Sequence, residues 1–70
     1  MITHTAIGQN LKALRNAQNL TQEQVVNDLE ISHRYYGLVE QGNVNPSIGY
    51  LLRLSNYYGI SLAEIVEDRM

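Results

Sequence analysis

The sequence predicts an all-α fold, a compact bundle of five short helices. Apolar residues recur at spacings of three and four, the period of one helix face, and no alternating strand pattern persists. Hydroxyl residues precede several of these periodic segments, and glycines follow two of them, as at the two ends of helices. The connections are short, without a linker, an internal repeat or a low-complexity stretch. These three observations together indicate one domain over residues 1–70.

The first predicted helix covers residues 5–17, and the second begins after Thr21. Gln24 stands three residues after Thr21 and completes a capping box, in which each side chain bonds the other residue's backbone amide. Glu30 and Ile31 then form the turn that ends this helix. The residues expected to face inward are Ile7, Leu11 and Leu14 in the first helix and Val25, Val26 and Leu29 in the second.

The third predicted helix begins after Ser32, which suits the capping position, and ends at Gly42 by the usual left-handed glycine device. Tyr36 and Val39 face inward in this helix. The loop that follows contains Pro46, which suits the first turn of the fourth helix.

The fourth predicted helix ends at Gly59, and the fifth opens with Ser61 and Glu64 as a second capping box. Both helices carry an apolar stripe at helical spacing. The residues expected to face inward are Ile48, Leu51, Leu54, Ser55 and Tyr58 in the fourth helix and Leu62, Ile65 and Val66 in the fifth.

Length and composition limit the class of protein. The chain has 70 residues, 44% of them hydrophobic, and no cysteine, so packing must supply its stability. The lack of cysteine suits a reducing compartment. No apolar run approaches the ~20 residues of a membrane span, and the N-terminus lacks the basic start and apolar stretch of a signal peptide. We expect a cytoplasmic protein that does not bind a membrane.

Residues 20–42 carry most of the functional signal. They form two short helices joined by a tight turn, and the second is rich in large polar and aromatic side chains. This is the layout of a helix-turn-helix, whose second helix enters the major groove of double-stranded DNA.

The net charge of −2 is unusual for such a domain, because DNA-binding domains are generally basic. In residues 1–60 four basic residues balance four acidic ones. The excess negative charge comes from Glu64, Glu67 and Asp68, offset only by Arg69. A neutral body gains little affinity from counterion release, so base contacts would have to supply more of it.

Several motifs occur together at spacings that resemble one family: LKALR, LTQEQ, VEQG, NPS and YGISLAEI, between residues 7 and 66. The chain resembles the phage-repressor or XRE-type helix-turn-helix family, which includes Cro-like regulators. The resemblance implies a lambda-repressor-like bundle with the helix-turn-helix at its second and third helices.

The resemblance also implies roles for individual residues. Arg15 and Glu40 occupy the positions of a buried ion pair between the first and third helices, for which a bidentate arginine–carboxylate contact is suited. Gln22 occupies the position of a residue that bonds a DNA phosphate. The base-reading positions are His33, Arg34 and Leu38.

Each base-reading residue has an ordinary alternative. Arg34 suits O6 and N7 of guanine, and otherwise is a solvated arginine. His33 either contacts a base or covers the start of its helix. Tyr35 either touches the DNA backbone or packs against the second helix. Leu38 meets a thymine methyl, is a tolerated surface residue or belongs to a protein interface. Asn43 either donates to a phosphate or stabilises its turn.

Four residues depart from the family pattern: Val26, where a small residue is usual, Tyr36, where an aliphatic residue is usual, Glu30 and Gly37. Glu30 replaces the usual turn glycine, so it must adopt a conformation that glycine takes more easily. Gly37 lies inside the third helix, which costs roughly 1 kcal/mol relative to alanine. Gly37 either permits a close approach of DNA or is the small residue needed where the third helix crosses the second.

No chemistry beyond binding is predicted. Two histidines and no cysteine do not make a metal site, and the chain has no glycine-rich phosphate loop or nucleophile elbow. The adjacent Glu67 and Asp68 are expected to be solvated acids rather than a catalytic pair. We therefore expect no enzymatic activity, no cofactor and no small-molecule substrate.

The fourth and fifth helices carry apolar residues beyond the inward stripe, among them Leu52 and Tyr57. Two-fold dimers are the commonest oligomers, and one recognition helix rarely gives enough specificity. We expect a homodimer through these helices, with Leu52, Tyr57 and Ile65 at the interface. The alternative is that these side chains only cover the core.

The sequence predicts a sequence-specific DNA-binding transcription regulator, either a small repressor or a restriction–modification controller. An alternative on the same fold is a protein-interaction module, an antagonist or assembly factor with little DNA binding. A third possibility is the N-terminal domain of a longer regulator, since EDRM gives no clear stop to the fifth helix.

Overall fold

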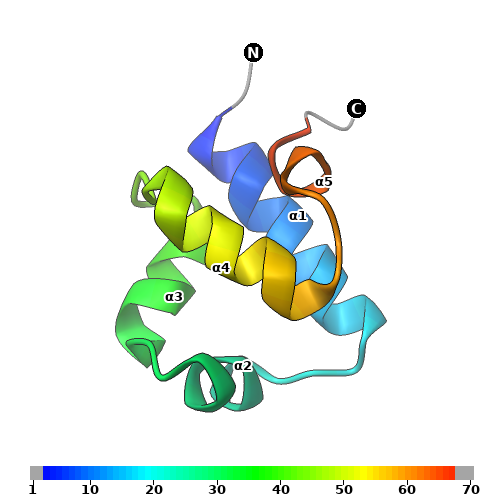
Figure 1. Cartoon of the computed structure of the whole chain (residues 1–70). Coiled ribbons are helices and arrows are strands. Elements are labelled where there is room, and N and C mark those ends of the chain that lie inside the picture. The colour runs from blue at the N-terminus through cyan, green and yellow to red at the C-terminus, as the bar shows by residue number, and fades with distance from the viewer. Residues whose placement is uncertain (1–2, 68–70) are drawn as a thin grey trace.

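The computed structural model describes residues 3–67, and five helices follow one another there, without a strand in that part of the chain (Figure 1). The predicted all-α class and the number of helices are confirmed. Asp68 and Arg69 of the expected acidic tail lie outside the described residues. The helices are α1 (His4–Ala17), α2 (Gln22–Leu29), α3 (His33–Gln41), α4 (Ile48–Tyr58) and α5 (Leu62–Val66).

Short polar residues fix where the first three helices begin. The hydroxyl of Thr3 accepts from the amide of Ala6, so α1 starts one residue earlier than predicted. The predicted box at α2 is present: the amide of Gln24 donates to Thr21 Oγ1 at 3.1 Å, and the amide of Thr21 donates to Gln24 Oε1 at 2.8 Å. Ser32 caps α3 as expected.

Three predictions for α4 and α5 are wrong. Pro46 precedes the capping residue Ser47 and so lies outside the first turn of α4. Ile48 was expected to face inward but is 62% exposed, because a first-turn side chain leans past the start of its helix, beyond the core. The box of Ser61 with Glu64 does not form: the amide of Glu64 bonds the backbone carbonyl of Ser61 instead of its hydroxyl.

Left-handed residues end three of the helices. Gly42 and Gly59 end α3 and α4 with φ of 78° and 72°, as predicted. Glu30 ends α2 with φ of 56°, the conformation expected of it in place of the usual glycine. A non-glycine residue there costs about 1 kcal/mol, and in exchange the chain turns sharply from α2 into α3.

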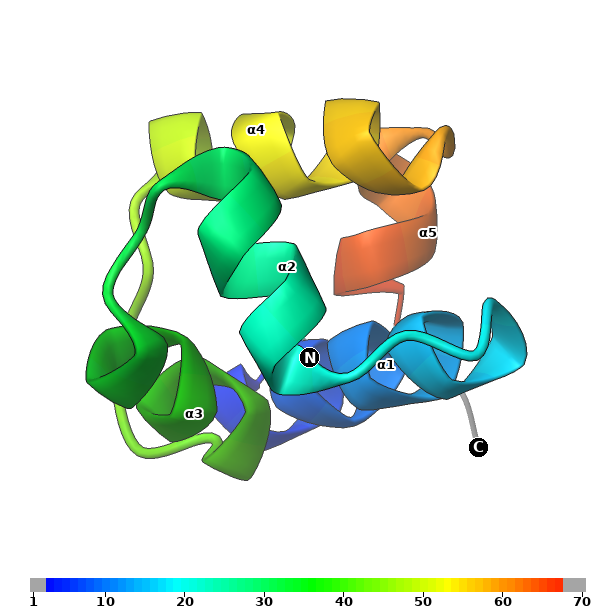
Figure 2. The same ribbon diagram turned by 90° about the horizontal axis from the view of Figure 1, so that it is seen from below.

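One core holds the five helices together. Viewed from below, α1 and α4 lie on opposite sides, α3 and α5 lie at the two ends, and α2 crosses the near face (Figure 2). Near the crossing of α1 and α3 stands Gly8, where a Cβ would lie only 2.4 Å from the carbonyl oxygen of Glu40. The two backbones therefore touch there. The buried apolar residues are Ile7, Leu11, Val25, Val26, Tyr36, Val39, Leu51, Leu54, Tyr58 and Ile65.

The two ends of the described chain are also joined. Asn10 is buried in α1, and its amide donates to the carbonyls of Ile65 at 2.8 Å and Glu67 at 2.6 Å, so it satisfies the end of α5. None of the helices in residues 3–67 has the length and apolar character that a membrane crossing requires.

Candidate nucleic-acid interface

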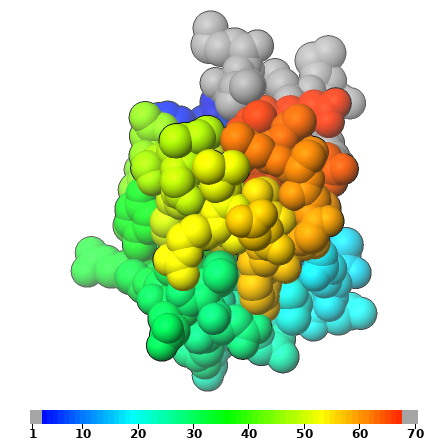
Figure 3. Space-filling model, viewed as in Figure 1, coloured from blue at the N-terminus to red at the C-terminus, as the bar shows by residue number. Residues whose placement is uncertain are grey.

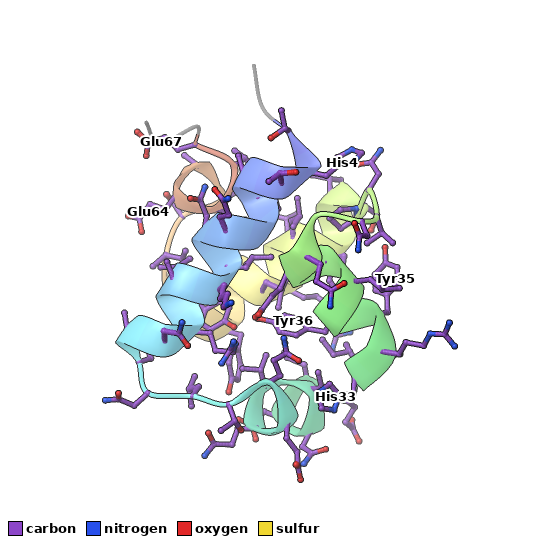
Figure 4. The ribbon with its side chains drawn as sticks, turned by 180° about the vertical axis from the view of Figure 1, so that it is seen from behind. His4, His33, Tyr35, Tyr36, Glu64 and Glu67 are labelled. Carbon is purple, nitrogen blue, oxygen red and sulfur yellow. The ribbon has the colours of Figure 1, made fainter. Side chains whose placement is uncertain are left out.

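The outer face of α3 is open. His33, Arg34 and Gln41 are exposed, and Gly37 and Leu38 between them are half-buried. A side chain of the green α3 segment projects from the outline of the molecule in Figure 3. Figure 4 shows His33 at the start of α3, beside α2, while Tyr36 points into the bundle. α3 thus has a polar outer face that is open to solvent and an inner face that packs in the bundle.

The inner face of α3 is held by a buried polar contact to α4. The hydroxyls of Tyr36 and Tyr58 lie 2.6 Å apart, and the two side chains are 0% and 4% exposed. Burial raises the pKa of both hydroxyls, so they stay neutral and one donates to the other. Because a hydrogen bond is directional, this contact limits rotation of α3 as well as its distance from α4.

The ion pair expected between Arg15 and Glu40 is present. Nε of Arg15 donates to Glu40 Oε2 at 2.8 Å and Nη2 donates to Oε1 at 3.1 Å, the bidentate form. Nη1 donates to the carbonyl of Leu20 at 2.9 Å, so the guanidinium also holds the loop before α2. Burial raises the pKa of Glu40, but the hydrogen bonds from Arg15 and Gln22 outweigh it and hold the pKa below its usual value.

Gln22 joins the first turns of α2 and α3. Its Nε2 donates to Glu40 Oε1 at 3.0 Å, and its Oε1 lies 3.3 Å from Nε2 of His33. The side chain is half-buried, and its amide group is already engaged within the protein. The contact with His33 could not be predicted from the sequence, because periodicity does not report how two helix starts meet in space.

Tyr35 and Asn43 take ordinary structural positions. Tyr35 is half-buried and meets Tyr50 of α4 edge to face, with ring centroids 5.2 Å apart. Tyr35 thus packs on α4, a partner that neither alternative named. Asn43 is exposed, and its Nδ2 donates to Gln41 Oε1 at 3.0 Å, the turn-stabilising alternative.

Gly37 is not needed for helix packing. A Cβ built there would meet only Gln22 Oε1, at 3.8 Å, which is an ordinary contact. The crossing of α2 and α3 would therefore accept an alanine, and the packing alternative for this glycine is not supported. The other alternative, a close approach of DNA at this residue, stays a prediction.

The residues expected at a dimer interface differ in exposure. Leu52 is 45% exposed, while Ile65 is completely buried in the core and has no surface to offer a second copy. Tyr57 is half-buried, and its hydroxyl donates to Asp28 at 2.6 Å, which raises its pKa to about 12. Ile48, which sequence reasoning placed inside, is exposed one turn before Leu52.

The positive charges within the described part are few and dispersed. Lys12, Arg34 and Arg53 are exposed, but Arg53 donates to the carbonyl of Leu29 at 2.6 Å and so stabilises the end of α2. Residues 3–67 contain no group of three or more His, Cys, Asp or Glu side chains placed to hold a metal ion.

The tight turn between α2 and α3, the pinned inner face of α3 and its open outer face define a helix-turn-helix domain. A family model described as "Helix-turn-helix domain" matches residues 6–67 of this chain. The chain therefore belongs to the helix-turn-helix family of the phage-repressor, XRE type.

Individual relatives are regulators of several kinds. The control protein C.MunI of Mycoplasma is 34% identical over 62 residues, which are 87% of this chain and 84% of that protein. The cryptic phage CTXphi transcriptional repressor RstR of Vibrio cholerae is 31% identical over 83% of this chain. The chain spans 52% of RstR, 43% of the immunity repressor of Bacillus phage phi105 and 34% of PuuR of Escherichia coli.

A solved structure resembles the whole bundle. The restriction-modification controller protein C.AhdI from Aeromonas hydrophila superposes with a TM-score of 0.83 and is 32% identical. The match covers 89% of this chain and 94% of that one, so both proteins share the complete arrangement of helices.

Proposed function

We propose that this protein is a sequence-specific DNA-binding transcription regulator, of the small-repressor or restriction–modification controller type. The observation that carries the proposal is the mounting of α3. Its outer face is exposed, while hydrogen bonds and an ion pair fix its inner face to α1, α2 and α4. A helix held rigidly with one free polar face suits insertion into the major groove.

Within this proposal Arg34 is the principal base-reading residue. It is exposed in the first turn of α3, and its donor fork matches the O6 and N7 acceptors of guanine. Leu38, one turn later on the same face, is placed to meet a thymine methyl. Gln22 positions α3, since its amide is already bonded to Glu40.

The regulator acts as a homodimer through α4. Ile48 and Leu52 lie one turn apart on that helix and are the exposed large hydrophobic residues of the described chain. Leu52 and the ring of Tyr57 would meet their equivalents across a two-fold axis. The two copies of α3 would then reach half-sites about one DNA turn apart, ~34 Å.

The net charge of the chain determines how strongly its DNA binding should depend on salt. With a net charge of −2, each protomer would neutralise only one or two phosphates. For a dimer, a plot of the logarithm of the binding constant against the logarithm of the salt concentration should therefore have a slope of only about −2 to −4. A steeper slope in fluorescence titrations would contradict the charge argument.

The direct experiment is a selection of bound duplexes from a random pool, followed by binding of the recovered site. A palindromic site is expected. Replacing Arg34 by alanine should cost about 1–3 kcal/mol and relax specificity at one base position. Lys12→Ala removes the same charge from α1 and should not relax specificity. If no site is recovered, or Arg34→Ala binds unchanged, a protein-interaction module replaces this proposal.

The proposed role has no catalytic step and requires no cofactor or small-molecule substrate. Its partner is double-stranded DNA. We retain the cytoplasm as its place of action, because that is where a regulator of this type meets its operator.

A further inference from the structure

A line of hydrogen bonds runs from the core to the DNA-facing surface and fixes the direction of each donor along it. It starts at Arg15, which is always charged and only donates. Both oxygens of Glu40 accept from this guanidinium, at 2.8 and 3.1 Å. A carboxylate held in this way is ionised and acts only as an acceptor.

The acceptor character of Glu40 sets the orientation of Gln22. Glu40 Oε1 can accept only from the amide nitrogen of Gln22, which lies 3.0 Å away. The carbonyl oxygen of the same amide must then point to the other side, where His33 Nε2 lies at 3.3 Å. The usual ambiguity between the two ends of a glutamine amide is thus removed by the ion pair behind it.

We propose that Gln22 holds neutral His33 in the Nε2–H tautomer, so that Nδ1 accepts a hydrogen bond from the exocyclic amino group of adenine or cytosine in the major groove. The Gln22 carbonyl has no hydrogen to give, so the contact requires the hydrogen on His33 Nε2. In a neutral imidazole the other nitrogen then carries only a lone pair. This inference rests on the proposed DNA-binding function.

The base preference follows from the chemistry of the groove. The N6 amino group of adenine and the N4 amino group of cytosine are the hydrogen-bond donors there, whereas guanine and thymine present acceptors. A lone pair on His33 therefore favours adenine or cytosine and opposes guanine or thymine. Its neighbour Arg34 has only donors and makes the opposite selection. Two adjacent exposed side chains would read bases of opposite hydrogen-bonding character.

The tautomer is tested on the free protein by nitrogen NMR of the histidine rings at pH 8, where an ordinary histidine is neutral. His33 should show one protonated Nε2 and one unprotonated Nδ1. The exposed His4 is the internal reference and should show shifts averaged between both tautomers. Gln22→Leu should move His33 toward the averaged pattern, and Gln9→Leu, on the exposed side of α1, should not. A protonated Nδ1, or no effect of Gln22→Leu, would overturn the proposal.

The base contact is tested with modified operators at the position whose preference disappears in His33→Ala. For adenine, purine removes the N6 amino group and 7-deazaadenine removes the N7 acceptor. Wild-type protein should bind the purine operator about 3- to 10-fold more weakly than the 7-deaza operator. In His33→Ala this difference should vanish. For cytosine, the analogue without the N4 amino group should weaken binding by a similar factor.

The outcomes separate the inference from the function it rests on. A palindromic site with sensitivity to the 7-position instead of the amino group would leave DNA binding intact and overturn the inference. Guanine or thymine opposite His33 would do the same. A pool that yields no site overturns the proposed function and the base readout with it, whatever tautomer NMR finds.

Discussion

Gly37→Ala should make the protein more stable and a weaker DNA binder. The added Cβ meets only Gln22 Oε1, at 3.8 Å, so no neighbour within the protein has to move. Alanine is better than glycine inside a helix by roughly 0.5–1 kcal/mol. In a domain of this size each kcal/mol raises the melting temperature by about 4–8 °C. We expect an increase of about 2–8 °C in thermal unfolding followed by circular dichroism.

The effect on DNA has the opposite sign. Gly37 lies one turn after His33 on α3 and is half-buried beside Gln22, so in the proposed complex the new methyl group would lie at the boundary between α3 and DNA. Forcing a methyl group into a packed contact costs about 1–3 kcal/mol, so operator affinity should fall by about 5- to 150-fold for each protomer that carries the change.

Gly49→Ala is the matched control. It adds a methyl group to an exposed helical position, 4.0 Å from Ser47 Oγ, on α4 instead of α3. Because Gly49 adjoins Ile48 and Leu52 of the proposed dimer interface, dimerisation is measured alongside, and the dimer that forms should bind the operator with unchanged affinity. A destabilised Gly37→Ala protein would refute the packing argument. Unchanged operator affinity in Gly37→Ala would refute the close approach of DNA at this residue.

Three further predictions concern the scaffold. Gly8→Ala should destabilise the fold by about 1–3 kcal/mol in urea titrations, since its Cβ would meet backbone oxygens at 2.4 and 2.5 Å and push α1 from α3; stability equal to wild type would contradict that contact. Tyr50→Phe should be neutral or stabilising by up to about 1 kcal/mol, because the Tyr50 hydroxyl is buried without a hydrogen-bond partner in the described structure. Its burial also raises the pKa of this hydroxyl to about 12. A clear loss of stability in Tyr50→Phe would show that the hydroxyl has a partner after all. The lowered pKa of Glu40 predicts a contribution to stability that is complete above the usual glutamate value and is lost as pH falls through the lower folded value. Glu40→Gln should flatten this acid dependence below about pH 4.5 and be destabilising at neutral pH by about 3 kcal/mol, because Arg15 is left half-buried without its carboxylate.

Local signals predicted the helices well, because capping and helix ends depend on neighbours in the sequence. Thr21 with Gln24, Ser32, Gly42 and Gly59 all act as expected. The left-handed turn at Glu30 was expected from the family resemblance, because a glycine usually stands at that position.

Two errors concern local signals, the place of Pro46 and the Ser61–Glu64 box. The others lie where a residue's surroundings come from distant parts of the chain. Helical periodicity placed Ile48 on the inward stripe, but the core does not extend to the first turn of α4. Neither alternative considered for Tyr35 included its contact with Tyr50 of α4, for the same reason. The Arg15–Glu40 pair was found only through family resemblance, since its members are 25 residues apart. The contact of Gln22 with His33 had no signal in the sequence at all.

Tyr36 and Glu40 lie one turn apart on the inner side of α3, and each bonds a different helix. If the inner face of α3 were purely apolar, the helix could rotate about its axis at little cost in free energy. Here a rotation of α3 by a single residue, about 100°, would leave the Tyr36 hydroxyl and the Glu40 carboxylate both buried without their partners. The angular setting with which this protein faces a nucleobase is therefore decided behind the helix, by groups that never touch the nucleic acid.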